Sequence, residues 1–409
     1  MNDPKLSQKP LIAILLGAPF TEQNYKRTGV PYLKESFDVI VLDCNPWLRV
    51  GFQKLSFIEY NYPSIIKINT SDDFVKIIVK LQPKYAIDFL GLGEYTFFIQ
   101  NILQTYGVRI VLQRTGTLPT PSRIKIFLAL LKNNPPQLWQ RLSKKIGQKQ
   151  KKWKIIAPHI ALVAGRKSLD RQTLTAEKKL WIGSQDYYTY KMVESNLAQT
   201  LDRNVARSNY IVFIDSGIAL GSDAILLGLP YFSQNQIDNY YISLQNAFDI
   251  FEKITGWSVK VAAHSSVKVI EEKYRNLFGR RDVYDGMTAQ LIQHSQLVLS
   301  HASTALSYAV LWEKPIILLM MSKDLDLFAK KYFTIETLII NQLSIELDGP
   351  LLFLEAHERE YLKAYQKSKP VNREKYAEYV DNYIRSKETV EESIWQEFSS
   401  LVKQEQMLL

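Results

Sequence analysis

The stretch Ser295–Leu319 reads SQLVLSHASTALSYAVLWEKPIILL. Two runs of large aliphatic residues, one before His301 and one after Pro315, have the length and composition of buried strands. The segment between them opens with small hydroxyl residues and continues with apolar residues at helical spacing, which predicts a tight turn followed by a helix. A strand, a helix and a second strand in this order form a parallel βαβ unit.

The turn at His301–Thr304 is predicted to hold an anionic group. Free backbone N–H groups and the helix dipole favour negative charge at the start of a helix, and Ser303 and Thr304 add hydroxyl groups. A purely structural interpretation is also open, because Ser and Thr are ordinary helix N-caps.

Similar patterns recur along the chain and predict an α/β fold. Apolar, β-branched runs alternate with helical segments, as in a parallel sheet that helices cover on both faces. The predicted strands of the first half are Leu11–Leu16, Phe37–Leu42, Ser64–Ile68, Tyr85–Leu90, Val108–Leu112 and Ile160–Val163. Those of the second half are Tyr210–Ile214, Ser258–Ala263, Gln296–Ser300 and Pro315–Leu319, with a long helix at Asn239–Thr255 that ends at Gly256.

The length of 409 residues and the hydrophobic content of 46% allow two separate cores. We expect two Rossmann-like domains that face a central cleft. The first covers residues 1–205 and carries a basic insertion at 118–153, and the second covers 206–370. The charged helical tail at 371–409 is expected to pack back across the hinge.

Several classes of protein are excluded or unsupported. Cys44 is the single cysteine, so a disulfide framework, a CxxC pair and a thiolate zinc site are excluded. The N-terminus lacks a signal-peptide pattern, and no apolar run reaches the roughly 20 residues of a membrane span. No P-loop, GxGxxG, HExxH or GxSxG motif is present. We therefore predict a cytoplasmic protein without a metal site or cofactor.

Positive charge is concentrated in one segment. The chain has a net charge of +10, and residues 95–169 contain fourteen Lys or Arg but no Asp or Glu. Such a segment attracts an anionic partner, which is a lipid head group, a nucleic acid or an acidic polymer. A nucleic-acid partner is disfavoured, because the segment lacks interleaved aromatic residues that stack on bases.

Two short amphipathic helices are predicted within this segment, on either side of Pro135 and Pro136. The first follows Ser122, and its apolar face consists of Ile124, Phe127, Leu128 and Leu131. The apolar face of the second consists of Leu138, Trp139, Leu142 and Ile146. Cations accompany both apolar faces, so we expect residues 122–153 to dock on an anionic membrane surface. The alternative is that the apolar faces pack on the N-terminal domain.

Two further polar clusters follow predicted strands of the second domain. The carboxyl ends of parallel strands are where open α/β sheets bind ligands. The first cluster runs from Asp215 to Asp223, and the alternative is that both carboxylates merely cap a turn or a helix. The second is His264, which either binds phosphate, acts as an acid near neutral pH or is an ordinary loop histidine. Nearby in the sequence are Arg275, Arg280 and Arg281.

These motifs resemble those of GT-B-type glycosyltransferases of bacterial surface-polysaccharide synthesis. The resemblance is to retaining Kdo transferases and other enzymes that use CMP-activated ulosonic acids. It covers about residues 180–320 and is strongest in the last third of that range. The similar segments are Asp186–Tyr188, Tyr210–Asp215, Tyr240–Tyr241, Val261–His264, Thr288 with Leu291, and His301–Pro315.

The resemblance implies transfer of Kdo or a sialic-acid-like sugar from CMP to a lipid-linked or oligosaccharide acceptor, in capsule, O-antigen or lipopolysaccharide synthesis. It makes the first domain the acceptor-binding domain and the second the nucleotide-sugar-binding domain, at the inner face of the cell membrane. Asp215 is then the nucleophile or key carboxylate, with Asp223 and His264 as further catalytic residues. The residues expected to bind the nucleotide are His264, Arg281, His301, Ser303, Thr304 and Glu313. The leaving phosphate needs hydrogen-bond donors but no metal.

Two other functions stay open at this point. A polyol-phosphate transferase of GT-B shape uses a CDP-alditol and has a similar histidine and serine-rich helix start. A non-catalytic binding protein keeps the same shape without the reaction. Product analysis with CMP-sugars and CDP-alditols separates the first from a sugar transferase, and nucleotide binding tests the second.

Overall fold

The computed structural model describes residues 9–48, 59–91, 94–133, 156–195, 201–217, 233–264, 272–320, 330–389 and 394–407. The chain divides into two compact units, which are described one at a time. Unit 1 comprises residues 1–115, 151–185 and 385–409, and unit 2 comprises residues 116–150 and 186–384. None of the described helices combines the length and apolarity needed to cross a membrane.

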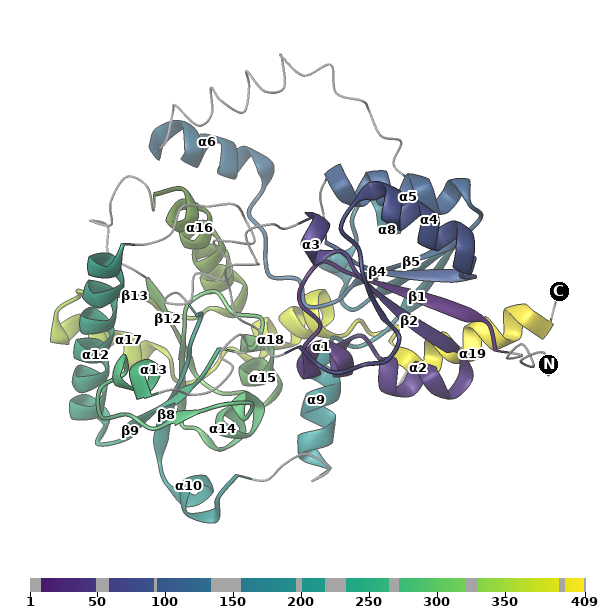
Figure 1. Cartoon of the computed structure of the whole chain (residues 1–409). Coiled ribbons are helices and arrows are strands. Elements are labelled where there is room, and N and C mark those ends of the chain that lie inside the picture. Colours follow the sequence, from purple (N-terminus) through teal and green to yellow (C-terminus); the bar gives the residue numbers. More distant parts are fainter. Residues whose placement is uncertain are drawn as a thin grey trace. The chain divides into compact units, whose positions relative to one another are not determined.

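Unit 1 is built on a parallel sheet of seven strands in the order β3-β2-β1-β4-β5-β6-β7 (Figure 1). The order reverses between β1 and β4, as in a doubly wound Rossmann-like sheet. The strands are β1 (Leu11–Leu16), β2 (Asp38–Asp43), β3 (Ile65–Lys67), β4 (Tyr85–Phe89), β5 (Arg109–Arg114), β6 (Ile160–Val163) and β7 (Lys178–Trp181). The helices are α1 (Glu22–Arg27), α2 (Val30–Ser36), α3 (Asn45–Leu48), α4 (Ser71–Leu81), α5 (Glu94–Thr105), α8 (Arg171–Leu174) and α19 (Ile394–Met407).

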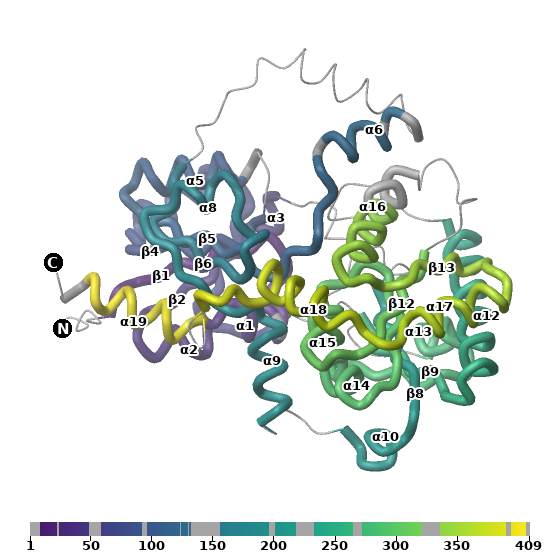
Figure 2. The backbone as a smooth tube through the Cα atoms, turned by 180° about the vertical axis from the view of Figure 1, so that it is seen from behind, coloured from purple at the N-terminus to yellow at the C-terminus, as the bar shows by residue number. Residues whose placement is uncertain are grey.

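Helices cover both faces of this sheet. Phe74 and Ile78 of α4 and Ile99 of α5 pack with Ala13 and Leu15 of β1 in one buried cluster. On the opposite face, α19 lies beside α2, as both views of the backbone show (Figure 2). The alternation of side chains along each strand thus gives unit 1 two apolar layers.

Unit 2 is built on a parallel sheet of six strands in the order β10-β9-β8-β11-β12-β13. The strands are β8 (Tyr210–Ile214), β9 (Ser258–Ala262), β10 (Val283–Tyr284), β11 (Leu297–Ser300), β12 (Ile316–Met320) and β13 (Leu351–Phe353). The helices are α6 (Arg123–Asn133), α9 (Gln185–Glu194), α10 (Arg203–Arg207), α12 (Gln234–Thr255), α13 (Glu272–Asn276), α14 (Thr288–His294), α15 (Leu306–Leu311), α16 (Lys330–Leu347), α17 (Glu358–Lys367) and α18 (Arg373–Tyr379).

The two faces of the second sheet carry separate core clusters. Phe213 of β8 packs with Phe248 of α12 on one face, and Val212 packs with α14 and α15 on the other. Ser233 and Gln236 form a capping box at the start of α12, and Gly256 ends the helix at φ +70°. The prediction of two Rossmann-like α/β domains is confirmed by these two sheets.

The boundary between the two units lies earlier than predicted. It follows Gln185 rather than residue 205, because Tyr187 and Val193 of α9 are buried in the core of unit 2. The N-terminal part of the basic insertion also belongs to unit 2, where α6 lies beside α16 in both views (Figures 1 and 2). The second predicted amphipathic helix, at 138–146, lies outside the described residues.

The predicted C-terminal tail is split between the units. Tyr376 and Tyr379 of α18 are buried in the core of unit 2, whereas residues 385–409 belong to unit 1. There, an added Cβ on Gly29 would lie 2.2 Å from the Trp395 ring of α19. The last helix therefore packs closely within unit 1, and the predicted packing of the tail across the hinge stays a prediction.

Glu405 of α19 joins the amino ends of several strands of unit 1. Its carboxylate accepts hydrogen bonds from Tyr85 at 2.6 Å, Arg109 at 3.0 Å and Lys178 at 2.7 Å. His159 lies 3.0 Å from the same carboxylate. Although burial raises the pKa of Glu405, the hydrogen bonds from Lys178, Tyr85 and His159 outweigh it and lower the pKa to about 2.

Glu405→Gln is expected to lower the free energy of unfolding by about 2–3 kcal/mol at neutral pH. Because the pKa of Glu405 is lower in the folded state, the ionised carboxylate stabilises the fold above its unfolded pKa, and this contribution is lost as the pH falls toward 2. Urea unfolding of both proteins from pH 7 downward measures the effect. The control is Glu177→Gln, which changes an exposed carboxylate that also pairs with His159. Its free energy of unfolding should fall by less than about 1 kcal/mol. Equal losses in both variants would contradict this assignment.

Candidate functional site

The carboxyl edge of the unit 2 sheet brings predicted site residues together. Its strand order reverses between β8 and β11, which is the switch point where open α/β sheets bind ligands. Asp215 follows β8, His264 lies just beyond β9, and His301 follows β11. Because the three strands are parallel neighbours, the three residues meet at the same edge.

Asp215 is a buried carboxylate at this switch point. It is 2% exposed, and the Tyr274 hydroxyl of α13 donates a hydrogen bond to Oδ2. Among the described residues, Oδ1 has no hydrogen-bond partner. Burial raises the pKa of Asp215, with opposing contributions from the Tyr274 hydrogen bond and the nearby His264 ring. Asp215 therefore has one oxygen fixed by the protein and one oxygen with unused hydrogen-bonding capacity.

Two hydroxyl groups at the same edge share this property. Ser300 is the last residue of β11 and pairs in register with Ile214 of β8. Its Oγ and that of Ser216 are buried, and neither has a hydrogen-bond partner in the part of the chain that the structure describes. Most buried polar atoms in proteins are hydrogen-bonded, so their gathering at one sheet edge points to a polar ligand.

His264 lies against the turn that follows Asp215. Gly217 has φ +66°, and a Cβ added there would lie 2.8 Å from Cγ and Nδ1 of the His264 ring. Only glycine combines this backbone conformation with this close approach. The predicted proximity of the Asp215 and His264 clusters is therefore present in the structure, and the His264 side chain is half-buried.

His301 has a structural role that the sequence did not predict. The side chain is fully buried, Nδ1 donates to the Leu319 carbonyl at 2.8 Å, and the Tyr240 hydroxyl donates to Nε2 at 2.9 Å. Burial lowers the pKa of His301 to about 4, so the ring is neutral at physiological pH. Both ring nitrogens are occupied, and the expectation that His301 contacts a phosphate is not supported.

Ser303 is half-buried and Thr304 is exposed, on the turn that follows His301. The Ser303 hydroxyl accepts a hydrogen bond from the Ala305 amide at 3.2 Å, and α15 begins only at Leu306. Among the described residues, no hydrogen bond uses the amide N–H of Ser303 or Thr304. The turn therefore offers amide donors beside Ser300, and binding of an anion there stays a prediction.

Two predicted nucleotide-binding residues lie at the opposite edge of the sheet. Arg281 precedes β10 and pairs with Asp249 and Glu252 of α12, the latter at 2.9 Å. Glu313 follows the end of α15 and pairs with Arg373 at 2.9 Å. A helix after a strand returns the chain to the amino ends of the strands, so neither residue reaches the carboxyl edge. Their assignment to the nucleotide stays a prediction, and their position at the amino edge does not support it.

Asp223 lies outside the described residues, so its predicted catalytic role stays a prediction. A carboxylate that was not among the predicted site residues is Asp186, in the first turn of α9. Burial raises its pKa to about 6, against hydrogen bonds from Tyr308 and Ser307 at the start of α15. Tyr274 was also missed, because nothing in the local sequence indicates its contact with Asp215.

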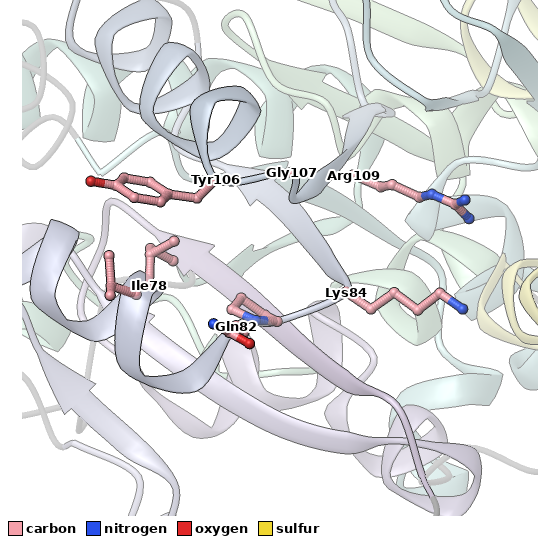
Figure 3. Close-up of a pocket in the computed structure, with 8 residues that line it drawn as sticks. Ile78, Gln82, Lys84, Tyr106, Gly107 and Arg109 are labelled. Carbon is pink, nitrogen blue, oxygen red and sulfur yellow. The ribbon is translucent and has the colours of Figure 1, made fainter.

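A pocket in unit 1 lies away from any carboxyl edge. It is lined by residues of the α4–β4 and α5–β5 connections, including Ile78, Gln82, Lys84, Tyr106 and Arg109 (Figure 3). These connections lead into the amino ends of β4 and β5. Ligands of open α/β sheets bind at the other edge, so this pocket is not assigned to the substrate.

Solved structures share this arrangement of two sheets. The S. aureus MnaA structure with UDP has a TM-score of 0.51 and 11% identity over 98% of each chain. The fold is of the GT-B type. A UDP-GlcNAc 2-epimerase from Methanocaldococcus jannaschii has a TM-score of 0.48 and 11% identity over 96% of this chain and 99% of that one. Acinetobacter baumannii MurG has a TM-score of 0.44 and 9% identity over 97% of this chain and 99% of that one.

No protein-family model matches the chain, and no curated protein matches it. At these identities, structural similarity establishes the fold alone. Many unrelated activities share one fold, so the function has to be argued from the residues of the site.

Proposed function

We propose that unit 2 binds a nucleotide sugar at the carboxyl ends of β8, β9 and β11 and that the protein is a glycosyltransferase. The observation that carries the proposal is the gathering of Asp215, His264 and Ser300 at the switch point, where the described residues give Asp215 Oδ1 and Ser300 Oγ no hydrogen-bond partner. A nucleotide sugar supplies hydroxyl groups for these atoms and a phosphate for the neighbouring turn.

The proposed donor is a CMP-activated ulosonic acid of the Kdo or sialic-acid type. This part of the proposal rests on the sequence resemblance described above. The phosphate of CMP would accept hydrogen bonds from the amide groups of Ser303 and Thr304 and from the His264 ring. The site offers these donors next to Asp215, where the bond between sugar and phosphate has to break.

Asp215 is the proposed key carboxylate of the transfer. The bond from the anomeric carbon to the phosphate oxygen breaks, and CMP leaves with the electron pair. The acceptor hydroxyl oxygen then bonds to that carbon, and its proton passes to the departing phosphate. Asp215 Oδ1 either attacks the anomeric carbon first or stabilises its positive charge. The unused hydrogen-bonding capacity of Oδ1 suits both routes, and Tyr274 holds the other oxygen in place.

The proposed acceptor is a lipid-linked or oligosaccharide glycan, bound by unit 1 at the inner face of the cell membrane. Within unit 1, the equivalent carboxyl edge also carries a buried polar network. Asp88 accepts hydrogen bonds from the Leu90 amide at 2.8 Å and from Gln100 at 2.7 Å. Glycan hydroxyl groups bind to such convergent polar side chains.

Nucleotide binding gives the first test. CMP is expected to raise the thermal midpoint of unfolding, because a ligand at 100 times its dissociation constant stabilises the bound unit by about 2.7 kcal/mol. CDP tests the alditol-phosphate alternative, and UDP is included because the S. aureus structure contains it. A larger shift with CMP than with CDP or UDP supports the proposed donor class.

The remaining outcomes decide between proposals. A larger shift with UDP or CDP would keep the nucleotide-sugar site and replace the donor. No shift with any of the three nucleotides would contradict the transferase and leave a binding protein of GT-B shape. Adenosine monophosphate is the control for a general effect of phosphate and salt.

A further inference from the structure

The outer face of α6 is an apolar surface that the proposed site does not use. Its large side chains are exposed, at 71% for Ile124, 45% for Phe127, 55% for Leu128 and 48% for Leu131. The spacing i, i+3, i+4, i+7 places them in one stripe along the helix. Scattered exposed apolar residues are common, but a continuous stripe of four points to a binding surface.

The opposite side of α6 faces the protein. Ile126 is half-buried, and α6 lies beside α16 in both views of the chain (Figures 1 and 2). Within unit 2, the four side chains of the apolar stripe are exposed. The helix is therefore attached by one side and presents its apolar stripe outward.

Positive charge flanks this stripe. The helix sequence RIKIFLALLKN contains three cations and no carboxylate. At about 100° per residue, Lys125 lies at one side of the stripe, and its side chain is exposed. The surrounding residues 95–169 contain no Asp or Glu. An apolar stripe on a helix that carries cations and no carboxylate is typical of helices that lie in the plane of a membrane interface.

We propose that α6 docks the protein on an anionic lipid bilayer, with its four apolar side chains among the acyl chains and its cations at the head groups. Charge complementarity selects this partner. A second copy of the chain would place one cationic segment against another, which is repulsive. The partner does not depend on the nucleotide chemistry of unit 2, so either proposal can fail without the other.

Sedimentation of the full chain with vesicles tests this proposal. The wild type is expected to sediment with vesicles of phosphatidylcholine mixed with phosphatidylglycerol but not with phosphatidylcholine alone, and added salt should reduce the bound fraction. The proposal would be overturned if the wild type did not bind anionic vesicles, or if it bound anionic and phosphatidylcholine vesicles equally.

The double variant Ile124→Ser, Phe127→Ser should partition at least about tenfold more weakly into anionic vesicles. The matched control is Ile242→Ser on α12, because the Ile242 side chain is also exposed, at 56%. This variant should bind anionic vesicles as the wild type does. Thermal unfolding of each variant checks the fold. Unchanged partitioning of the double variant would refute the assignment to α6, and so would a wild-type dimer in solution that the double variant abolishes.

Discussion

Asp215→Asn is expected to reduce the turnover of a nucleotide-sugar donor by at least about a thousandfold. An asparagine keeps an acceptor for the Tyr274 hydroxyl, so the local geometry of the site is retained. It cannot attack the anomeric carbon, and it carries no charge to stabilise that carbon. Turnover of a CMP-ulosonic acid by wild type and variant, followed by product analysis, measures the effect.

The same variant should be at least as stable as the wild type at neutral pH. Burial raises the pKa of Asp215 above its unfolded value, so the folded state binds the proton more tightly. The buried charge therefore destabilises the fold as the pH rises from the unfolded pKa through the folded pKa, and the cost is complete above both. Asparagine removes this cost, and the thermal midpoint should stay equal or rise. Functional residues often lower stability in this way.

The control for this variant is Asp282→Asn. Asp282 pairs with Lys260 at 3.1 Å at the amino edge of the same sheet, and its side chain is 66% exposed. Its turnover should equal that of the wild type. A covalent sugar detected by mass spectrometry on the wild type but not on Asp215→Asn would identify the nucleophilic route. Unchanged turnover of Asp215→Asn would remove Asp215 from the mechanism.

Gly217→Ala is expected to weaken nucleotide binding at least about tenfold and to destabilise unit 2 by about 1–3 kcal/mol. The backbone φ of +66° disfavours alanine, and the new Cβ would lie 2.8 Å from the His264 ring. Relief of this contact requires His264 to move away from the turn. Titration calorimetry with CMP and urea unfolding measure the two effects.

The control variant Gly256→Ala separates the effect of backbone strain from the effect of moving His264. Gly256 has φ +70°, but a Cβ added there meets no atom within 4 Å. This variant should lose a similar free energy of unfolding to backbone strain and keep the CMP affinity. If both variants bind CMP as the wild type does, His264 has no part in the nucleotide site.

The sheet strands were predictable where an apolar run is long. Leu11–Leu16 and Tyr210–Ile214 are buried along their length, and hydrophobic burial dominates such segments. The two short strands β10 and β13 of unit 2 contain only 2 and 3 residues and gave no periodic pattern. The unit boundary was missed because burial of Tyr187 in a distant core leaves no local mark in the sequence.

Site residues were predictable from the sequence where they directly follow a recognisable strand. Asp215 and His264 lie at the carboxyl edge, because each follows a strand whose direction the sequence indicated. His301 was placed correctly along the chain, but its burial depends on contacts with Tyr240 and Leu319 from other elements. The contact of Tyr274 with Asp215 has the same origin and was not foreseen.

Amide hydrogen exchange with and without CMP tests the central claim most directly, because it locates the nucleotide on the chain. We expect slower exchange in peptides that cover residues 210–217, 258–264 and 297–306, at the ends of β8, β9 and β11. Peptides at the amino edge, around Arg281 and Glu313, should exchange as they do without CMP. Protection that appears only in unit 1, or nowhere, would contradict the assignment of the nucleotide site.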